Sequence, residues 1–127
     1  MLLKDYEKGQ SLKGREKFLK VQFRNLLPPA ESIYDLIEDC MLSDAGGSIF
    51  CGVNEKTSKV EGLLTNAMQL QMLGDRVEAL FPSKQFRSFY HFVGVPVRQA
   101  FEGDFQMQEN QSHRQVIEIH VQSICEF

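Results

Sequence analysis

The residues best suited to hold a metal ion or to act as nucleophiles in this chain are its cysteines and histidines. These are Cys40, Cys51, Cys125, His91, His113 and His120. No two cysteines form a CxxC pair and their number is odd, which argues against a disulfide framework and favours a reducing compartment, the cytoplasm. His120 and Cys125 could share a metal, but a zinc site needs four ligands. We therefore interpret them as a strand residue and an unrelated thiol near the strand's end.

Basic residues are concentrated near the N-terminus. They are Lys4, Lys8, Lys13, Arg15, Lys17, Lys20 and Arg24. With three acidic residues, positions 4–24 carry a charge of +4, whereas 25–127 hold seven basic and fourteen acidic residues, a charge of −7. The net charge of −3 argues against a generic nucleic-acid binder. The basic segment is either a solvated arm or an edge that faces phosphate groups.

The hydrophobic pattern predicts the elements that position these residues. Strands are expected at 18–24, 48–53, 59–64, 89–101 and 115–122, and helices at 30–43 and 66–81. Asn66 is the expected N-cap of the second helix. Turn residues at 54–58 predict a hairpin, and Pro96 indicates an edge strand or a bulge. This order predicts an α+β fold, a mostly antiparallel sheet packed with two helices.

Length and composition bound the size of the fold. The chain has 127 residues, of which 43% are hydrophobic and 24% are charged, enough for one globular domain. A bilayer span needs about 20 apolar residues, and we expect no transmembrane segment in this chain. The sequence stops directly after a strand, so we expect the natural chain to continue past Phe127. A membrane anchor in that continuation would lie outside the 127 residues.

A glycine-rich segment carries the clearest motif. It reads Gly46-Gly47-Ser48-Ile49-Phe50-Cys51-Gly52-Val53-Asn54-Glu55, followed by Lys59-Val60-Glu61-Gly62. This resembles the signature of the Schlafen family and its AlbA-type relatives. Residues 20–24 resemble the family's Val-Glu-Phe-Lys strand, and residues 121–125 resemble its closing strand. The resemblance implies a Schlafen-like AlbA-type domain over 16–127, a single lobe preceded by a basic arm at 1–15.

The resemblance implies RNA chemistry, from which this chain departs. Active members cut RNA with three carboxylates that bind Mg²⁺ or Mn²⁺. The corresponding positions are Lys17, Gln22 and Asn54, which change three negative charges to about one positive charge and would repel a divalent ion. Glu16 and Glu55, each one residue from such a position, leave open a rearranged carboxylate site. Of the family's zinc ligands only Cys125 is kept, so we predict no structural zinc.

These departures favour a subunit without catalytic residues or metal of its own. We expect it to resemble the small single-lobe subunits of the nematode Schlafen-fold endoribonuclease complex that processes piRNA precursors. It would pair with a Schlafen-like subunit that carries the active site and its Mg²⁺ or Mn²⁺. The expected RNA-binding residues are Lys13, Arg15, Lys17, Lys20 and Arg24. The alternatives are a metal-dependent endoribonuclease that uses Glu16 and Glu55, and a non-catalytic nucleic-acid-binding or scaffold domain.

Overall fold

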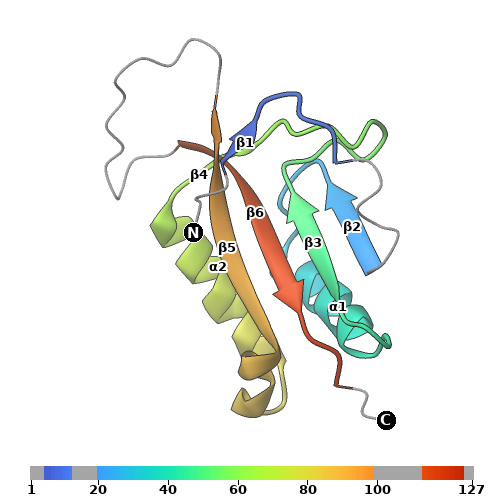
Figure 1. Cartoon of the computed structure of the whole chain (residues 1–127). Coiled ribbons are helices and arrows are strands. Elements are labelled where there is room, and N and C mark those ends of the chain that lie inside the picture. The colour runs from blue at the N-terminus through green and yellow to red at the C-terminus, as the bar shows by residue number, and fades with distance from the viewer. Residues whose placement is uncertain (1–4, 13–19, 99–112, 125–127) are drawn as a thin grey trace.

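The computed structural model describes residues 5–12, 20–98 and 113–124 (Figure 1). Its strands are β1 (Tyr6–Glu7), β2 (Lys20–Arg24), β3 (Gly47–Cys51), β4 (Leu63–Thr65), β5 (Tyr90–Arg98) and β6 (His113–Val121). Its helices are α1 (Ala30–Met41), α2 (Ala67–Leu80) and the short 3-10 helix η2 (Lys84–Phe89). None of the described helices is long and apolar enough to cross a bilayer.

The strands form one sheet in the order β1-β5-β6-β3-β2, and β4 also pairs with β6. The predicted α+β class is confirmed, but the sheet is mixed. β6 pairs antiparallel with β3, β4 and β5, whereas β2 with β3 and β1 with β5 are parallel. Parallel neighbours need a crossover connection, and α1 provides it between β2 and β3. The prediction of a mostly antiparallel sheet missed these two pairs.

The predicted hairpin of 48–53 with 59–64 is only partly present. Val53 and Val60 form an isolated antiparallel bridge, but β4 pairs with β6 instead of β3. The chain leaves the sheet after β3, makes a closed loop over 53–61, and returns in β4 farther along the same side of β6. Gly52, at a φ of 102°, and Gly62 meet where the loop closes, and a Cβ on Gly52 would lie 3.1 Å from the Gly62 Cα. The absence of a side chain at Gly52 and Gly62 therefore lets the two ends of the 53–61 loop pack against each other.

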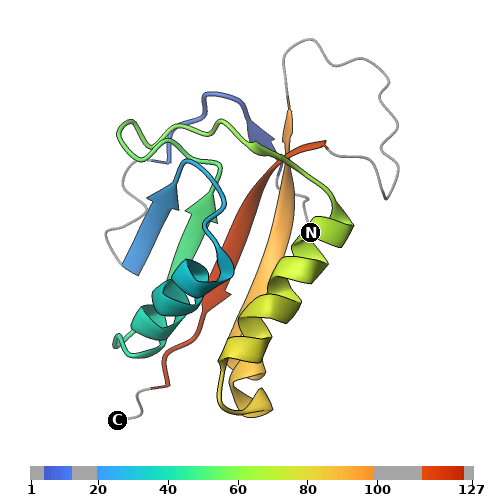
Figure 2. The same ribbon diagram turned by 180° about the vertical axis from the view of Figure 1, so that it is seen from behind.

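Both long helices cover one face of the sheet (Figure 2). The core on this face is formed by Ile33, Ile37, Cys40, Met41, Ile49, Cys51, Val77, Tyr90, Ile117, Ile119 and Val121. Four of these residues come from α1 at helical spacing (Ile33, Ile37, Cys40 and Met41), so the helix packs one apolar face onto the sheet. Asn66 begins α2 as predicted, in a capping box with Gln69.

The opposite face, which looks toward the viewer in Figure 1, carries a smaller apolar cluster near one end. Its buried members are Tyr6, Leu12, Phe50, Val53, Val60, Val97 and Val116. Two of them come from residues 5–12, so part of the segment expected to be a basic arm packs onto the sheet. The remainder of this face, which we call the open face, carries polar side chains from β3, β5 and β6.

Candidate functional site

Only some of the predicted site residues fall within the described part of the chain. Those outside it are Lys13, Arg15, Glu16, Lys17 and Cys125. Lys20 begins β2, and only its backbone is described. Gln22, Arg24, Asn54 and Glu55 can therefore be compared directly with the prediction.

Arg24 lies between Gln22 and Glu55. One guanidinium nitrogen donates to the Gln22 Oε1 at 2.8 Å, while the other donates to the Phe23 carbonyl at 2.9 Å and lies 3.8 Å from a Glu55 carboxylate oxygen. The Glu55 backbone N–H donates to the Asn25 side chain at 2.9 Å, which holds the loop against the end of β2. Sequence positions 22, 24 and 55 thus form one cluster with a cation at its centre. We call these three residues the Arg24 cluster.

Asn54 has a different role from the one its sequence position suggested. Its Oδ1 accepts from the backbone N–H groups of Lys56 and Thr57 at 2.9 and 3.0 Å, and its Nδ2 donates to Glu61 at 3.1 Å. Such bonds from an asparagine to the backbone two and three residues ahead stabilise a turn. The Asn54 side chain therefore shapes the 53–61 loop and is not part of the Arg24 cluster.

A groove of about 600 Å³ lies beside the Arg24 cluster, between the end of β2 and the beginning of α1. Its polar lining is Arg24, Asn25, Ser32, Asp35 and Glu55. The Arg24 and Glu55 side chains are 33% and 47% exposed, so their ion pair is weak and can exchange for another partner. A guanidinium that is accessible and planar can bind a phosphate group through two parallel hydrogen bonds.

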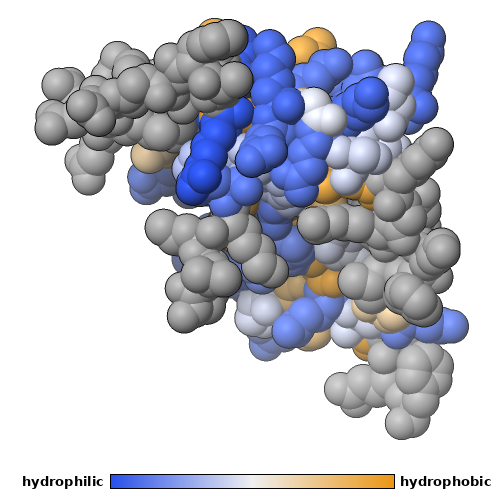
Figure 3. Space-filling view, turned by 45° about the horizontal axis from the view of Figure 1, so that its top comes forward, coloured by the Kyte–Doolittle hydropathy of each residue, from blue (hydrophilic) through white to orange (hydrophobic). Residues whose placement is uncertain are grey.

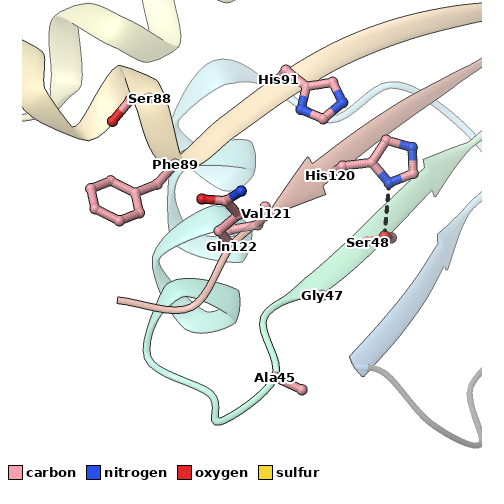
Figure 4. A pocket seen from close by; sticks show the side chains of 9 residues that line it. All are labelled: Ala45, Gly47, Ser48, Ser88, Phe89, His91, His120, Val121 and Gln122. Carbon is pink, nitrogen blue, oxygen red and sulfur yellow. Dashed lines mark hydrogen bonds between the residues drawn. The ribbon is translucent and has the colours of Figure 1, made fainter. Parts of the chain in front are cut away.

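A second polar arrangement, which we call the Ser48 relay, lies on the open face (Figure 4). The Ser48 Oγ lies 2.9 Å from the His120 Nδ1, and the His120 Nε2 lies 2.7 Å from Glu118. The Tyr6 hydroxyl donates to the other oxygen of the same carboxylate. The His91 ring lies beside the His120 ring, with 5.2 Å between their centroids. Four strands therefore contribute to one connected group.

Strand register creates this relay. Ser48 on β3 is paired with His120 on β6, and His91 on β5 is paired with the same histidine from the other side. Paired residues of neighbouring strands point to the same face, as do alternate residues of one strand. Within the strand predicted at 115–122, Glu118 and His120 are two positions apart and therefore share a face. Ser48, His91 and Tyr6 were missed because their positions depend on which strands become neighbours.

The rest of this side of the molecule is largely polar. In the space-filling view, hydrophilic residues gather over the end where β1 and the 53–61 loop lie, and a few hydrophobic side chains are visible below them (Figure 3). A pocket of about 150 Å³ opens near the other end of the sheet, lined in part by Ser48, His91 and His120. This pocket is where the relay becomes accessible to a small molecule.

The described cysteines, Cys40 and Cys51, are buried free thiols. Burial raises the pKa of Cys51 to about 12, and nearby Arg24 opposes that rise only in part. A thiol with so high a pKa is a poor nucleophile and a poor metal ligand. Among residues 5–12, 20–98 and 113–124, no three His, Cys, Asp or Glu side chains are grouped so as to hold a metal ion.

In comparisons with known proteins, no protein-family model matches this chain, and no curated protein matches it either. The functional assignment of the chain therefore depends on the geometry of its two polar sites, the Arg24 cluster and the Ser48 relay.

Proposed function

We propose that this chain is an RNA-binding subunit that does not itself cleave RNA. It pairs with a Schlafen-like subunit that carries the active site, in an endoribonuclease complex that processes small RNA such as piRNA precursors. The observation that supports this most directly is the Arg24 cluster. At one position where the family resemblance implies a metal-binding carboxylate, Gln22 instead accepts a hydrogen bond from the Arg24 guanidinium, which also lies 3.8 Å from Glu55.

The charge of this cluster favours phosphate over a divalent cation. Mg²⁺ and Mn²⁺ need several oxygen ligands and are repelled by a nearby positive group. Arg24 already occupies the space between Gln22 and Glu55, so a metal ion there would have to displace it. A phosphodiester can instead replace the exposed Glu55 as the partner of the guanidinium. The groove beside α1 leaves room for the RNA backbone.

An apolar surface patch supports the proposed partner subunit. Leu26 and Leu64, 73% and 65% exposed, both line a pocket near the start of α2. Met68 and Met72 follow on the outer side of that helix, 59% and 50% exposed. Exposed apolar side chains that gather on one part of a surface, as Leu26 and Leu64 do, are typical of protein interfaces. A cytoplasmic location belongs to the same proposal, because free buried cysteines are usual in a reducing compartment.

Salt-dependent RNA binding tests the proposal. The affinity of the purified chain for single-stranded RNA should fall steeply with salt, and Arg24→Gln should flatten the log–log slope by about 0.7, the value for one lost phosphate contact. Arg76→Gln is the matched control, since Arg76 is exposed on α2, away from the groove. A flat salt dependence of the unmodified chain would indicate a scaffold domain that does not contact RNA.

A nuclease assay separates the proposal from its main alternative. We expect no RNA cleavage by the chain alone with Mg²⁺ or Mn²⁺, and recovery of a second Schlafen-like protein when the chain is purified from its source. Metal-dependent cleavage that disappears in Glu55→Ala would instead establish the rearranged carboxylate site and overturn the proposal.

A further inference from the structure

We propose that Ser48 is the nucleophile of a second site, which hydrolyses small carboxylic esters on the open face. This inference is independent of the proposed RNA function, because the Ser48 relay shares no residue with the Arg24 cluster. It depends on three features: the hydrogen bonds that orient His120, the pocket that reaches Ser48, and a second imidazole beside the first.

The hydrogen bonds assign each proton of the relay. One oxygen of the Glu118 carboxylate accepts a hydrogen bond from the Tyr6 hydroxyl. The other oxygen lies 2.7 Å from the His120 Nε2. An ionised carboxylate can only accept, so the neutral imidazole must carry its proton on Nε2. Its Nδ1 is then the acceptor, and the Ser48 hydroxyl donates to it across 2.9 Å. His120 is therefore placed as a general base for Ser48.

This geometry meets the usual requirements for an activated serine. The serine and the base lie within hydrogen-bond reach, and a third group orients the base. The imidazole is turned the opposite way from that of the serine proteases, in which Nε2 faces the serine. Either nitrogen can accept the proton, provided that the acid binds the other one. Glu118, with a side chain only 14% exposed, binds the other one here.

The pocket gives a substrate access to the serine. Ser48 itself is 7% exposed, but with His91 and His120 it lines the cavity of about 150 Å³ (Figure 4). A cavity of this size suits an acyl group of a few carbon atoms and excludes a polymer. His91, an exposed residue on the neighbouring strand, faces the same cavity and can donate a hydrogen bond to the developing oxyanion.

The reaction proceeds in two balanced halves. As the Ser48 Oγ bonds to the ester carbonyl carbon, its proton passes to the His120 Nδ1. The bond from carbon to the leaving oxygen then breaks, and the Nδ1 proton goes to that oxygen to release the alcohol. A water molecule next attacks the acyl-serine and gives its proton to Nδ1. Release of the carboxylic acid returns the proton to the Ser48 Oγ, and Glu118 stabilises the imidazolium in both halves.

Covalent labelling tests the nucleophile directly. We expect a small fluorophosphonate to modify the intact chain, and peptide mass spectrometry to place the adduct on Ser48. Hydrolysis of p-nitrophenyl acetate should fall at least about 100-fold in Ser48→Ala. Ser83→Ala is the matched control and should keep the full rate, because Ser83 is exposed at the start of η2 and does not line the pocket.

The pH profile of hydrolysis tests whether Glu118 and Tyr6 position His120. Tyr6→Phe removes one hydrogen bond to Glu118 and should shift the pH profile of hydrolysis without abolishing fluorophosphonate labelling. An unlabelled Ser48 in the folded, unmodified chain would overturn the proposal, as would equal hydrolysis by the Ser48→Ala and unmodified chains. In either case the relay would serve only to join four strands.

Discussion

Gly46 is the position where a single added methyl group should be most damaging. It precedes β3 at a φ of 74°, and a Cβ there would overlap the Val121 carbonyl oxygen and lie 3.0 Å from the Ser123 backbone nitrogen. A residue other than glycine in this conformation costs about 1–2 kcal/mol. Overlap with the backbone of a neighbouring strand adds about 1–3 kcal/mol. Gly46→Ala should therefore lower the free energy of unfolding by about 3 kcal/mol.

Two other glycines separate the conformational cost of a side chain from the cost of its steric overlap. Gly9 also has a positive φ, of 86°, but a Cβ there would meet nothing within 4 Å, so Gly9→Ala should cost only the conformational part, about 1–2 kcal/mol. Gly74 is inside α2 with nothing within 4 Å, so Gly74→Ala should stabilise the chain by up to about 1 kcal/mol.

Urea unfolding followed by circular dichroism measures all three variants. Thermal unfolding should show Gly46→Ala melting about 12 °C lower, since 1 kcal/mol corresponds to about 4 °C in a chain of this size. If Gly46→Ala proved no less stable than Gly9→Ala, the close approach of β3 to the end of β6 would be refuted, and with it the physical reason for glycine at this position.

Two further predictions concern α2 and the buried thiols. Asn66→Ala removes the capping box and should cost about 1 kcal/mol in urea unfolding; an effect near zero would mean that water caps the helix equally well. Cys51 should resist iodoacetamide in the folded chain at pH 9 and react once urea unfolds it, because its pKa is about 12 when buried against 9.0 in an ordinary thiol. The same difference should make stability fall as pH rises from 9.0 toward 12, and Cys51→Ala should remove that part of the slope. Rapid alkylation of Cys51 in the folded chain would contradict its burial.

The two proposed sites use different parts of one sheet. The Arg24 cluster lies where β2 meets the 53–61 loop, beside the start of α1, whereas the Ser48 relay lies on the open face, between β3, β5 and β6. An RNA strand along the first site need not touch the second. Arg24→Gln and Ser48→Ala should therefore each change one activity and leave the other intact.

Local signals predicted the elements well because each depends on residues close in sequence. Three such signals are the apolar periodicity of α1, the Asn66 cap of α2 and the alternation of β6. Each can be recognised from residues within two helical turns, or within one strand, of one another. The hairpin prediction was partly wrong for the opposite reason. Turn residues at 54–58 could indicate that the chain reverses, but not that β4 would find more pairing on β6 than on β3.

The sequence by itself determined the α+β class, the position of the glycine-rich loop and the presence of a basic residue at position 24. Only the tertiary structure decided what these residues do together. Arg24 and Glu55 are 31 positions apart, and they meet because β2 and β3 are parallel neighbours. Ser48 and His120 meet because β3 and β6 pair in one particular register, and a shift of one residue would turn their side chains to opposite faces. Pairing between distant segments depends on the packing of the whole sheet, and no short stretch of sequence contains that information.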